Sequence, residues 1–319
     1  MNIRIGIVGY GNLGRGVELA ARKNPDIKIK YVFTRRNPES VRTYGTQVLS
    51  VDKILSYKEN IDCLILAGGS RTDLPYQTPM LSEHFNTVDS FDNHNSIKEH
   101  LKTAEESSSR GGKTAIVSAG WDPGILSLAR LYAASFMPYA TVNTFWGKGV
   151  SQGHSDAVRR IQGVKKAVQY TVPQNDAMSL ARAGIRLSAK EAHKRVCYVV
   201  AEEEDKERIK NEIISMPDYF LGYDTEVNFI TEEKFDREHR FMSHHGEVVS
   251  VGMSGIYENN IQSANLTLDL DSNPEFTAYV LVAAARAAVR LNREGKCGAY
   301  TFFDIPPKYF FSASPYQLL

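Results

Sequence analysis

The fold of this chain is decided near its N-terminus by Ile3-Arg4-Ile5-Gly6-Ile7-Val8-Gly9-Tyr10-Gly11-Asn12-Leu13-Gly14. The apolar residues 3–8 predict a short buried strand, and residues 15–23 predict a helix. Glycines at this spacing between a strand and a helix are typical of a dinucleotide-binding turn, although an ordinary glycine-rich turn is the alternative. Gly9 allows the tight turn, Gly11 lets the backbone approach a pyrophosphate, and Gly14 lets helix and strand pack closely. We therefore predict that the start of this helix faces a nucleotide phosphate.

The end of the second predicted strand indicates which nucleotide is bound. Residues 27–33 read as that strand, and Thr34-Arg35-Arg36 follow it. An acidic residue at this position usually binds the ribose 2′-hydroxyl of NAD. Guanidinium groups instead bind phosphate in bidentate fashion, whereas a carboxylate would repel it. The sequence therefore predicts NADP as the cofactor, and the alternative is an exposed charged pair.

Composition limits the class of protein. The 319 residues are enough for about two domains, and 42% hydrophobic with 24% charged residues is ordinary for a soluble globular protein. A net charge of +1 predicts no nucleic-acid or membrane partner. Three isolated cysteines argue against a disulfide framework and a cysteine zinc site, and we expect no metal. With no signal peptide and no apolar run of spanning length, we expect a cytoplasmic protein.

The first third of the chain alternates predicted strands and helices, which is the pattern of a doubly wound parallel sheet. Further strands at 61–66, 87–89 and 114–117 run into loops with small and acidic residues. Ligands of such sheets lie beyond the carboxyl ends of the strands. We therefore expect the loops that contain Asp92 and Asp122 to lie at the ligand edge.

The middle of the chain predicts a second, mixed α+β domain built around one sheet. Strand-like runs recur at 142–146, 167–172, 196–200, 226–230, 248–251 and 265–270. Asn273-Pro274 then begins a long helix to about Arg293, with Asn at the N-cap and Pro at the first helical position. We expect the tail after Gly295 to return to the first domain.

At this point the sequence resembles the meso-diaminopimelate dehydrogenase family, over nearly the whole chain. The motifs beyond the glycine turn are 120-GWDPG-124, 144-TFWG-147, 151-SQGHSDAVRRI-161, 169-QYT-171 and 216-MPDYF-220. The resemblance implies an α/β fold with a Rossmann-type doubly wound parallel sheet plus a second α+β substrate and dimerisation domain. It implies a homodimer with a dinucleotide-binding domain 1–120 joined by 296–319, dimerisation elements 121–150 and 268–295, and a substrate domain 151–267.

The resemblance also implies the reaction. The family carries out NADP-dependent, reversible oxidative deamination of the D-centre of meso-2,6-diaminopimelate in lysine biosynthesis. The products are L-2-amino-6-oxopimelate, ammonia and NADPH. Such a substrate has an ammonium and a carboxylate at each end, so its site needs acceptors for the first and donors for the second.

Two sets of residues follow from the resemblance for the cofactor and the D-centre. Asp92 and Asp122 would hold the reacting amine and order the attacking water, although turn formation alone would explain either aspartate. No general base stands out. Arg71 departs from the family string, and we expect it to face solvent. The cofactor set comprises Gly9, Tyr10, Gly11, Asn12, Leu13, Gly14, Thr34, Arg35, Arg36, Gly69, Ser70, Thr72 and Asp92.

A third set would hold the rest of the substrate. Arg195 would grip the distal carboxylate, and Trp146 would form an aromatic wall. His244 lies in a predicted polar loop next to His245, so either histidine could face the substrate. The substrate set comprises Trp121, Trp146, Gln152, Gly153, Thr171, Arg195, His244 and Asn273.

Several of these residues have a plainer explanation. Arg195 could be a surface residue, Gly153 a turn glycine, and Asn273 a helix cap. His154 and Asp156 suggest a catalytic pair, yet a helix start explains them more economically.

Two other functions remain open. One is a different two-domain NADP-dependent dehydrogenase of the saccharopine or aspartate type, which would need no distal carboxylate clamp. The other is a non-catalytic NADPH-binding sensor, because a glycine turn indicates binding and not turnover.

Overall fold

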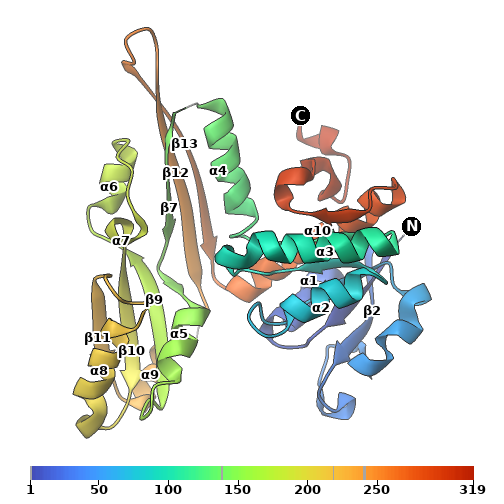
Figure 1. The fold of residues 1–319 in the computed structure, drawn as a ribbon, viewed down its shortest axis with the longest axis horizontal. Helices are drawn as coiled ribbons and strands as arrows, with labels where there is room; N and C mark the ends of the chain where they lie inside the picture. The colour runs from blue at the N-terminus through green and yellow to red at the C-terminus, as the bar shows by residue number, and fades with distance from the viewer. Residues whose placement is uncertain (1, 138, 218, 240–241) are drawn as a thin grey trace. The chain divides into compact units, whose positions relative to one another are not determined.

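The structure, a computed structural model, describes residues 2–137, 139–217, 219–239 and 242–319. The chain divides into two compact units, one ending at Leu128 and completed by Pro274–Leu319, the other spanning Ala129–Asn273 (Figure 1).

The first unit is built on a seven-stranded sheet in the order β14-β6-β5-β4-β1-β2-β3. Every neighbouring pair is parallel, and the strand order reverses direction between β1 and β4. The predicted doubly wound parallel sheet is confirmed, and β3 is a strand that the sequence did not predict. The strands are β1 Ile3–Val8, β2 Ile27–Thr34, β3 Gln47–Ser50, β4 Cys63–Leu66, β5 Asn86–Asp89, β6 Thr114–Ile116 and β14 Gly298–Tyr300.

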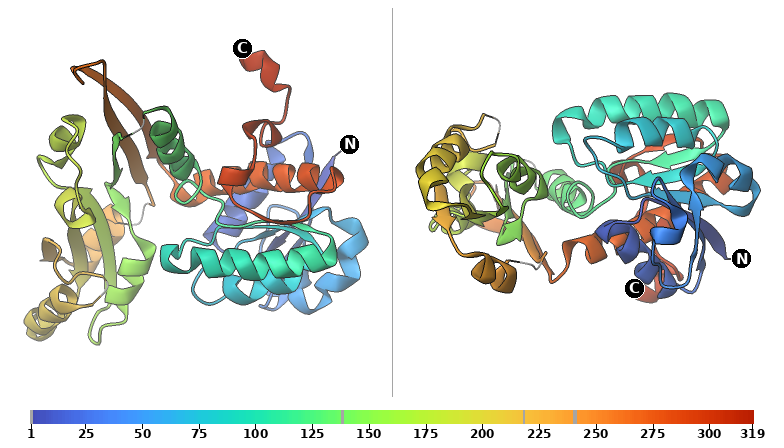
Figure 2. Two further views of the ribbon diagram at one scale, coloured as in Figure 1. Left: turned by 45° about the horizontal axis from the view of Figure 1, so that its top comes forward. Right: turned by 90° about the horizontal axis from the view of Figure 1, so that it is seen from below.

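Helices cover both faces of this sheet (Figure 2). Apolar residues of α1 and α10 pack with Ile5 and Ile7 on one face, and those of α2 pack with Leu64 and Leu66 on the other. The long helices are α1 Asn12–Arg22, α2 Leu74–Ser82, α3 Ile97–Gly111 and α10 Asn273–Arg293. The 3-10 helices are η1 Pro38–Ser40, η2 Val51–Asn60, η3 His94–Ser96, η5 Phe302–Asp304, η6 Pro307–Tyr309 and η7 Pro315–Leu318.

Two predicted helix starts were late by one or more residues. Helix α1 begins at Asn12, so Gly14 lies inside its first turn rather than before it. Helix α10 begins at Asn273 rather than at Pro274, and most of its length is buried in its own unit. The C-terminal segment lies in this unit, where β14 pairs in parallel with β6.

The second unit contains two sheets, whereas the sequence predicted one. The first has the order β11-β10-β9-β8, and the second has the order β13-β12-β7. The chain turns between β7 and β8, so that β7 pairs with β12 while β8 pairs with β9. The strands are β7 Thr141–Trp146, β8 Gly149–Val150, β9 Lys166–Pro173, β10 His193–Val200, β11 Thr225–Phe229, β12 His244–Ser254 and β13 Asn260–Leu270.

Strands β12 and β13 form a hairpin far longer than the predicted strands at 248–251 and 265–270. In Figure 1 its tip extends well beyond the rest of its sheet. The remaining helices are α4 Ile125–Phe136, α5 Gln152–Arg159, α6 Ala177–Arg182, α7 Ala189–Ala192, η4 Glu203–Asp205, α8 Lys206–Ser215 and α9 Glu232–Glu238. Among the described residues, no helix is long and apolar enough to cross a membrane.

Candidate functional site

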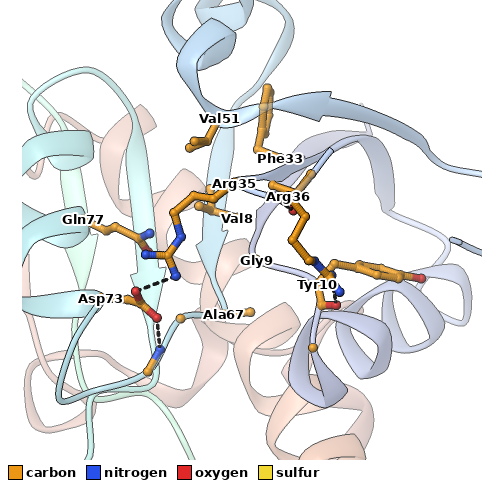
Figure 3. Close-up of a pocket in the computed structure, with 14 residues that line it drawn as sticks. Val8, Gly9, Tyr10, Phe33, Arg35, Arg36, Val51, Ala67, Asp73 and Gln77 are labelled. Atoms are coloured by element: carbon orange, nitrogen blue, oxygen red, sulfur yellow. Dashed lines mark hydrogen bonds and ion pairs between the residues drawn. The ribbon is translucent and has the colours of Figure 1, made fainter. Parts of the chain in front are cut away.

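A pocket of about 280 Å³ lies at the carboxyl ends of β1, β2 and β4, beside the point where the strand order reverses (Figure 3). This is where ligands bind in open parallel sheets. Seven residues of the predicted cofactor set line it, namely Gly9, Tyr10, Gly11, Thr34, Arg35, Arg36 and Gly69. The other lining residues are Val8, Phe33, Val51, Ala67, Gly68, Asp73 and Gln77.

The glycine turn has the geometry that a pyrophosphate site requires. Gly9 has a φ of 91°, which side chains rarely adopt, and a Cβ on Gly14 would lie 2.3 Å from the Gly9 carbonyl oxygen. A Cβ on Gly11 would meet nothing within 4 Å, so the backbone at the start of α1 is open to a ligand. Gly11 caps α1 without a side-chain hydrogen bond. The arrangement therefore fits an anion at this helix start.

The two arginines at the end of β2 are held by opposite walls of the pocket. The Arg35 guanidinium pairs with the Asp73 carboxylate at 2.8 Å, and Arg36 donates to the Tyr10 carbonyl oxygen at 2.7 Å (Figure 3). The Arg35 side chain is 70% exposed, so it remains available to a ligand. Thr34 is buried, and its hydroxyl accepts a hydrogen bond from the Arg36 backbone N–H at 3.1 Å.

Asp73 and Gln77 were missed by the sequence reasoning. Asp73 also accepts from the Gly69 backbone N–H at 2.9 Å, so it shapes the loop after β4. The Gln77 Oε1 atom is buried without a hydrogen-bond partner among the described residues. The sequence offered one signal for Asp73, because this residue lies directly before a helix start that contains Pro75.

The Tyr10 side chain ties the glycine turn to α1. Its hydroxyl donates to the fully buried Glu18 carboxylate of α1, which also accepts from the Thr46 hydroxyl at 2.6 Å. Burial and the contact with Glu18 raise the pKa of Tyr10. Burial alone would raise the pKa of Glu18, but hydrogen bonds from Thr46 and Tyr10 hold it below its usual value.

The rest of the predicted cofactor set lies around the pocket and not in its lining. Asn12, Leu13 and Gly14 belong to the first turn of α1. Ser70 and Thr72 lie in the loop between β4 and α2, and the adjacent Arg71 is exposed.

Asp92 and Asp122 follow neighbouring strands of the first unit, β5 and β6. Asp92 is exposed, and its backbone N–H donates to the Ser70 hydroxyl at 3.1 Å. Asp122 is partly buried and follows Trp121, which is 8% exposed. Both loops therefore extend from the carboxyl edge of the sheet, as the strand pattern predicted. Within the described ranges, no group of three or more His, Cys, Asp or Glu side chains is placed to hold a metal ion.

The second unit brings Thr171, Arg195 and His244 together in one row. Strand pairing sets Gly149 opposite Thr171 and Thr171 opposite Arg195, so these positions share a face of the sheet. The His244 ring covers Gly149, where a Cβ would lie 2.3 Å from it. Arg195 Nη1 donates to the Thr171 hydroxyl at 2.5 Å.

Arg195 is a partly buried cation without an ion pair in the part of the chain that the structure describes. Its Nε atom is buried and has no hydrogen-bond partner there. The guanidinium lies 4.3 Å from the centre of the Tyr223 ring. Burial lowers the pKa of Arg195, because desolvation disfavours its charged form. A buried charge without a counterion is costly, so this row is suited to receive an anion.

The structure separates the two candidate histidines. His244 is the first residue of β12 rather than part of a polar loop, and its Nδ1 lies 2.9 Å from the His245 carbonyl oxygen. His245 Nδ1 instead lies 2.6 Å from the Asp269 carboxylate on β13. The loop prediction failed because two adjacent histidines give no strand pattern. His244 therefore lies beside Thr171 and Arg195, whereas His245 is bonded to β13.

Of the remaining predicted substrate residues, Trp121 belongs to the first unit, and Trp146, Gln152, Gly153 and Asn273 belong to the second. The Trp146 backbone N–H donates to His193 Nε2 at 3.0 Å, and the Asn273 N–H donates to the Met242 carbonyl oxygen at 2.9 Å. Gln152 and Gly153 open α5, and the Gln152 side chain lies outside the described part of the chain.

His154 and Asp156 do not form the catalytic pair that the sequence suggested. His154 Nδ1 lies 2.7 Å from the Ser151 hydroxyl, and Asp156 pairs with Arg159. Burial and the nearby charge of Arg195 lower the pKa of His154 to about 4. His154 is therefore neutral at physiological pH. The start of a helix explains the two residues better than a catalytic pair does.

Comparison with known sequences gives a consistent result. Residues 120–272 match the family described as the diaminopimelic acid dehydrogenase C-terminal domain. The meso-diaminopimelate D-dehydrogenase of Ureibacillus thermosphaericus is 51% identical over 320 residues, covering 99% of this chain and 98% of that protein.

Solved structures agree in fold over the full length. The structure described as the Corynebacterium glutamicum DAP dehydrogenase in complex with DAP is 44% identical, with a TM-score of 0.93 and coverage of 99% of this chain and 98% of that one. An engineered D-amino acid dehydrogenase bound to NADP⁺ is 43% identical, with a TM-score of 0.89 and coverage of 100% and 98%. The match therefore includes both units.

Proposed function

Because the chain belongs to the meso-diaminopimelate D-dehydrogenase family, we propose that this amino-acid dehydrogenase catalyses NADP-dependent oxidative deamination of meso-2,6-diaminopimelate at its D-centre. The products are L-2-amino-6-oxopimelate, ammonia and NADPH, and the reaction is reversible. The step belongs to lysine biosynthesis in this proposal.

The cofactor assignment is supported by the pocket of the first unit. Arg35 and Arg36 bind the 2′-phosphate, and the open start of α1 binds the pyrophosphate. The bound NADP would supply the acceptor for the hydride that leaves the Cα of the D-centre. The pairing of Arg35 with Asp73 holds the guanidinium at the pocket before the phosphate arrives.

Asp92 and Asp122 act on the reacting end of the substrate. As carboxylates at the edge of the sheet they accept hydrogen bonds from the ammonium of the D-centre. After hydride loss the imine carbon is attacked by water, which the same carboxylates orient. The C–N bond then breaks, and ammonia leaves with the ketone formed.

The environment of the Arg195 side chain is the main support for the proposed substrate. Its guanidinium is partly buried, has an unpartnered Nε and lies in one row with Thr171 and a histidine. Such a group binds a carboxylate. A dehydrogenase of one-ended amino acids needs no such cation away from its reacting centre. The distal carboxylate of meso-diaminopimelate supplies the anion.

The test is a direct assay of the purified protein with meso-diaminopimelate and NADP⁺ at alkaline pH. We expect NADPH absorbance and ammonia to rise together, with little activity on the L,L-isomer, which lacks a D-centre. Preference for saccharopine or aspartate would replace the proposal with another dehydrogenase. Tight NADPH binding in calorimetry, with no turnover of any diamino acid, would replace it with a sensor.

We also propose a homodimer in the cytoplasm. Large apolar side chains are exposed on α4 and at the hairpin tip, including Phe136 at 77% and Ile256 at 95%. Within the proposed dimerisation elements 121–150 and 268–295, α4 is the better candidate because α10 is mostly buried in its own unit. All three cysteines are free thiols, as expected in a reducing compartment. Light scattering that gives a monomer mass at assay concentration would contradict the dimer.

A further inference from the structure

Asp89, at the end of β5, is a fully buried carboxylate that the proposed reaction does not use. Four donors converge on it. Its Oδ1 accepts from the backbone N–H groups of Phe91 at 3.1 Å and Ser118 at 2.9 Å. Its Oδ2 accepts from the Thr78 hydroxyl and from His100 Nε2, both at 2.7 Å. An ionised carboxylate offers four lone-pair sites, so every site is used.

The two N–H donors belong to the two loops that carry Asp92 and Asp122. Phe91 directly precedes Asp92, and Ser118 begins the segment that reaches Asp122. The Asp89 carbonyl oxygen also accepts from the Ala119 N–H at 2.8 Å. Ser118 has a φ of 55°, an uncommon backbone conformation that these contacts hold in place. One residue therefore fixes the start of both loops.

Two helices fix the Asp89 carboxylate in turn. Thr78 lies on α2 and His100 on α3, and both are buried. The His100 ring also stacks on Phe91, with centroids 4.1 Å apart and an angle of 13° between the planes. The helices that cover one face of the sheet are thus connected through Asp89 to the loops at its edge.

We propose that Asp89 is a positioning residue that sets the placement of the Asp92 and Asp122 loops, with Thr78 and His100 orienting its carboxylate. The inference rests on the proposed function for the roles of Asp92 and Asp122. Asp89 is fully buried and does not line the cofactor pocket, so its loss should act on turnover through the two loops.

Asp89→Asn tests this with little change in shape. The amide loses the charge that strengthens the two backbone hydrogen bonds, and its NH₂ group cannot accept from Thr78 and His100. Because misplacing a reacting group by about 1 Å can cost roughly 100-fold in rate, we expect kcat with meso-diaminopimelate to fall about 10- to 100-fold. The Kd for NADPH, measured by fluorescence titration, should change much less than kcat, because Asp92 is the one predicted cofactor residue in the displaced loops and the 2′-phosphate and pyrophosphate contacts are untouched.

Thr78 offers a matched pair of smaller changes. Thr78→Val removes the donor to Asp89 and preserves the shape, whereas Thr78→Ser keeps the donor. We expect Thr78→Val to lower kcat and Thr78→Ser to restore it toward the wild-type value. If Asp89→Asn does not fold, the two Thr78 variants still test whether the Asp89 carboxylate positions the loops.

Hydrogen exchange gives a readout that does not depend on activity. Peptides covering residues 90–93 and 117–123 should both exchange faster in Asp89→Asn than in the wild type, because Phe91 and Ser118 lose a charged acceptor. Asp26→Asn is the control, since it removes the charge that pairs with the buried Arg286 guanidinium (2.7 Å) in the same unit and touches neither loop. It should lower the unfolding midpoint and leave kcat unchanged.

A folded Asp89→Asn protein with wild-type kcat and wild-type exchange in both loops would overturn the inference. Equal kcat for Thr78→Val and Thr78→Ser at the wild-type level would do the same, as would an equal loss of kcat in Asp26→Asn. Wild-type protein without activity on meso-diaminopimelate would instead overturn the proposed function, and the exchange data would still show whether Asp89 clamps the loops.

Discussion

The arginines of the first unit and the arginine of the second unit are held in opposite ways. Arg35 and Arg36 already have protein partners, the Asp73 carboxylate and the Tyr10 carbonyl oxygen. Arg195 has the Thr171 hydroxyl and the face of Tyr223, and no ion pair of it is found among the described residues. Arg35 is largely exposed, whereas the Arg195 Nε is buried.

This difference indicates two ways of preparing a cation for an anionic ligand. In the first unit a carboxylate holds an exposed guanidinium in place, and the pair contributes little energy because water screens it. In the second unit the guanidinium is desolvated without a counterion, so it gains much more when a carboxylate arrives. Binding of the distal carboxylate should therefore lose more affinity without Arg195 than binding of the cofactor phosphate loses without either arginine of the first unit.

The largest expected effect on kinetics is that of Arg195→Met. The substitution leaves the distal carboxylate unpaired, so KM for meso-diaminopimelate should rise about 100-fold in steady-state assays. The unfolding midpoint should stay level or rise, because the partly buried charge is removed without leaving a carboxylate alone.

Lys194→Met is the matched control for that experiment. Lys194 precedes Arg195 on β10, points to the other face, and pairs with Glu226 at 2.5 Å. Its loss should leave KM unchanged. If Arg195→Met had the KM of the wild type, Arg195 would not bind the substrate, and the proposed difference between the arginines of the two units would be rejected.

The second effect is on stability at low pH. Burial lowers the pKa of His193 to about 4, and its Nε2 must stay unprotonated to accept from the Trp146 N–H. Between its ordinary pKa of 6.5 and about 4, the unfolded chain binds a proton that the native state does not, so stability falls as pH falls. The loss should be on the order of 3 kcal/mol for this residue, measured by urea unfolding from pH 7 to pH 4.

His193→Asn should flatten that pH dependence, because the residue then no longer titrates. His154 contributes a similar loss, and Arg195→Met should raise its pKa, since the Arg195 charge is one cause of the lowering. An unchanged slope in His193→Asn would show that His193 titrates normally in the native state.

The third effect concerns the cofactor. Replacing Arg35 and Arg36 together with alanine should raise KM for NADP⁺ about 30-fold, which is the loss of roughly 2 kcal/mol of charge-assisted bonding. KM for NAD⁺, which has no 2′-phosphate, should change little. Equal losses for the two cofactors would contradict a 2′-phosphate role.

The smallest expected effect is that of Asp73→Asn. Releasing Arg35 from a screened ion pair should tighten NADP⁺ binding by about threefold in calorimetry and leave NAD⁺ binding unchanged. The amide oxygen can still accept from the Gly69 N–H. Weaker binding of both cofactors would mean that Asp73 acts mainly by shaping the loop after β4.

Local patterns predicted the first unit better than the second. The glycine turn, the apolar strands and the break before Pro274 are determined by neighbouring residues, so the parallel sheet and its ligand edge could be predicted. Strand β8 has two residues and β12 begins with two histidines, and neither carries an apolar period. The second unit was therefore predicted with one sheet instead of two.

The candidate site shows the same limit. Arg35 and Arg36 follow a strand whose place in the sheet was predictable, so their position could be derived. The row formed by His244, Thr171 and Arg195 depends on strand register, which the sequence alone did not specify, and its members came from a family resemblance. The convergence of Thr78, His100 and two backbone N–H groups on Asp89 joins four separate segments and had no local signal.

Whether Arg195 binds the distal carboxylate during turnover of the D-centre can be decided with D-lysine. D-lysine has the same D-centre and side-chain amine as meso-diaminopimelate but lacks the distal carboxylate. The measurement is the ratio of kcat/KM for the two substrates in the wild type and in Arg195→Met. We predict a large preference for meso-diaminopimelate in the wild type that falls by about 100-fold in the variant, while activity on D-lysine is little changed. An equal loss on both substrates, or an unchanged ratio, would contradict the account.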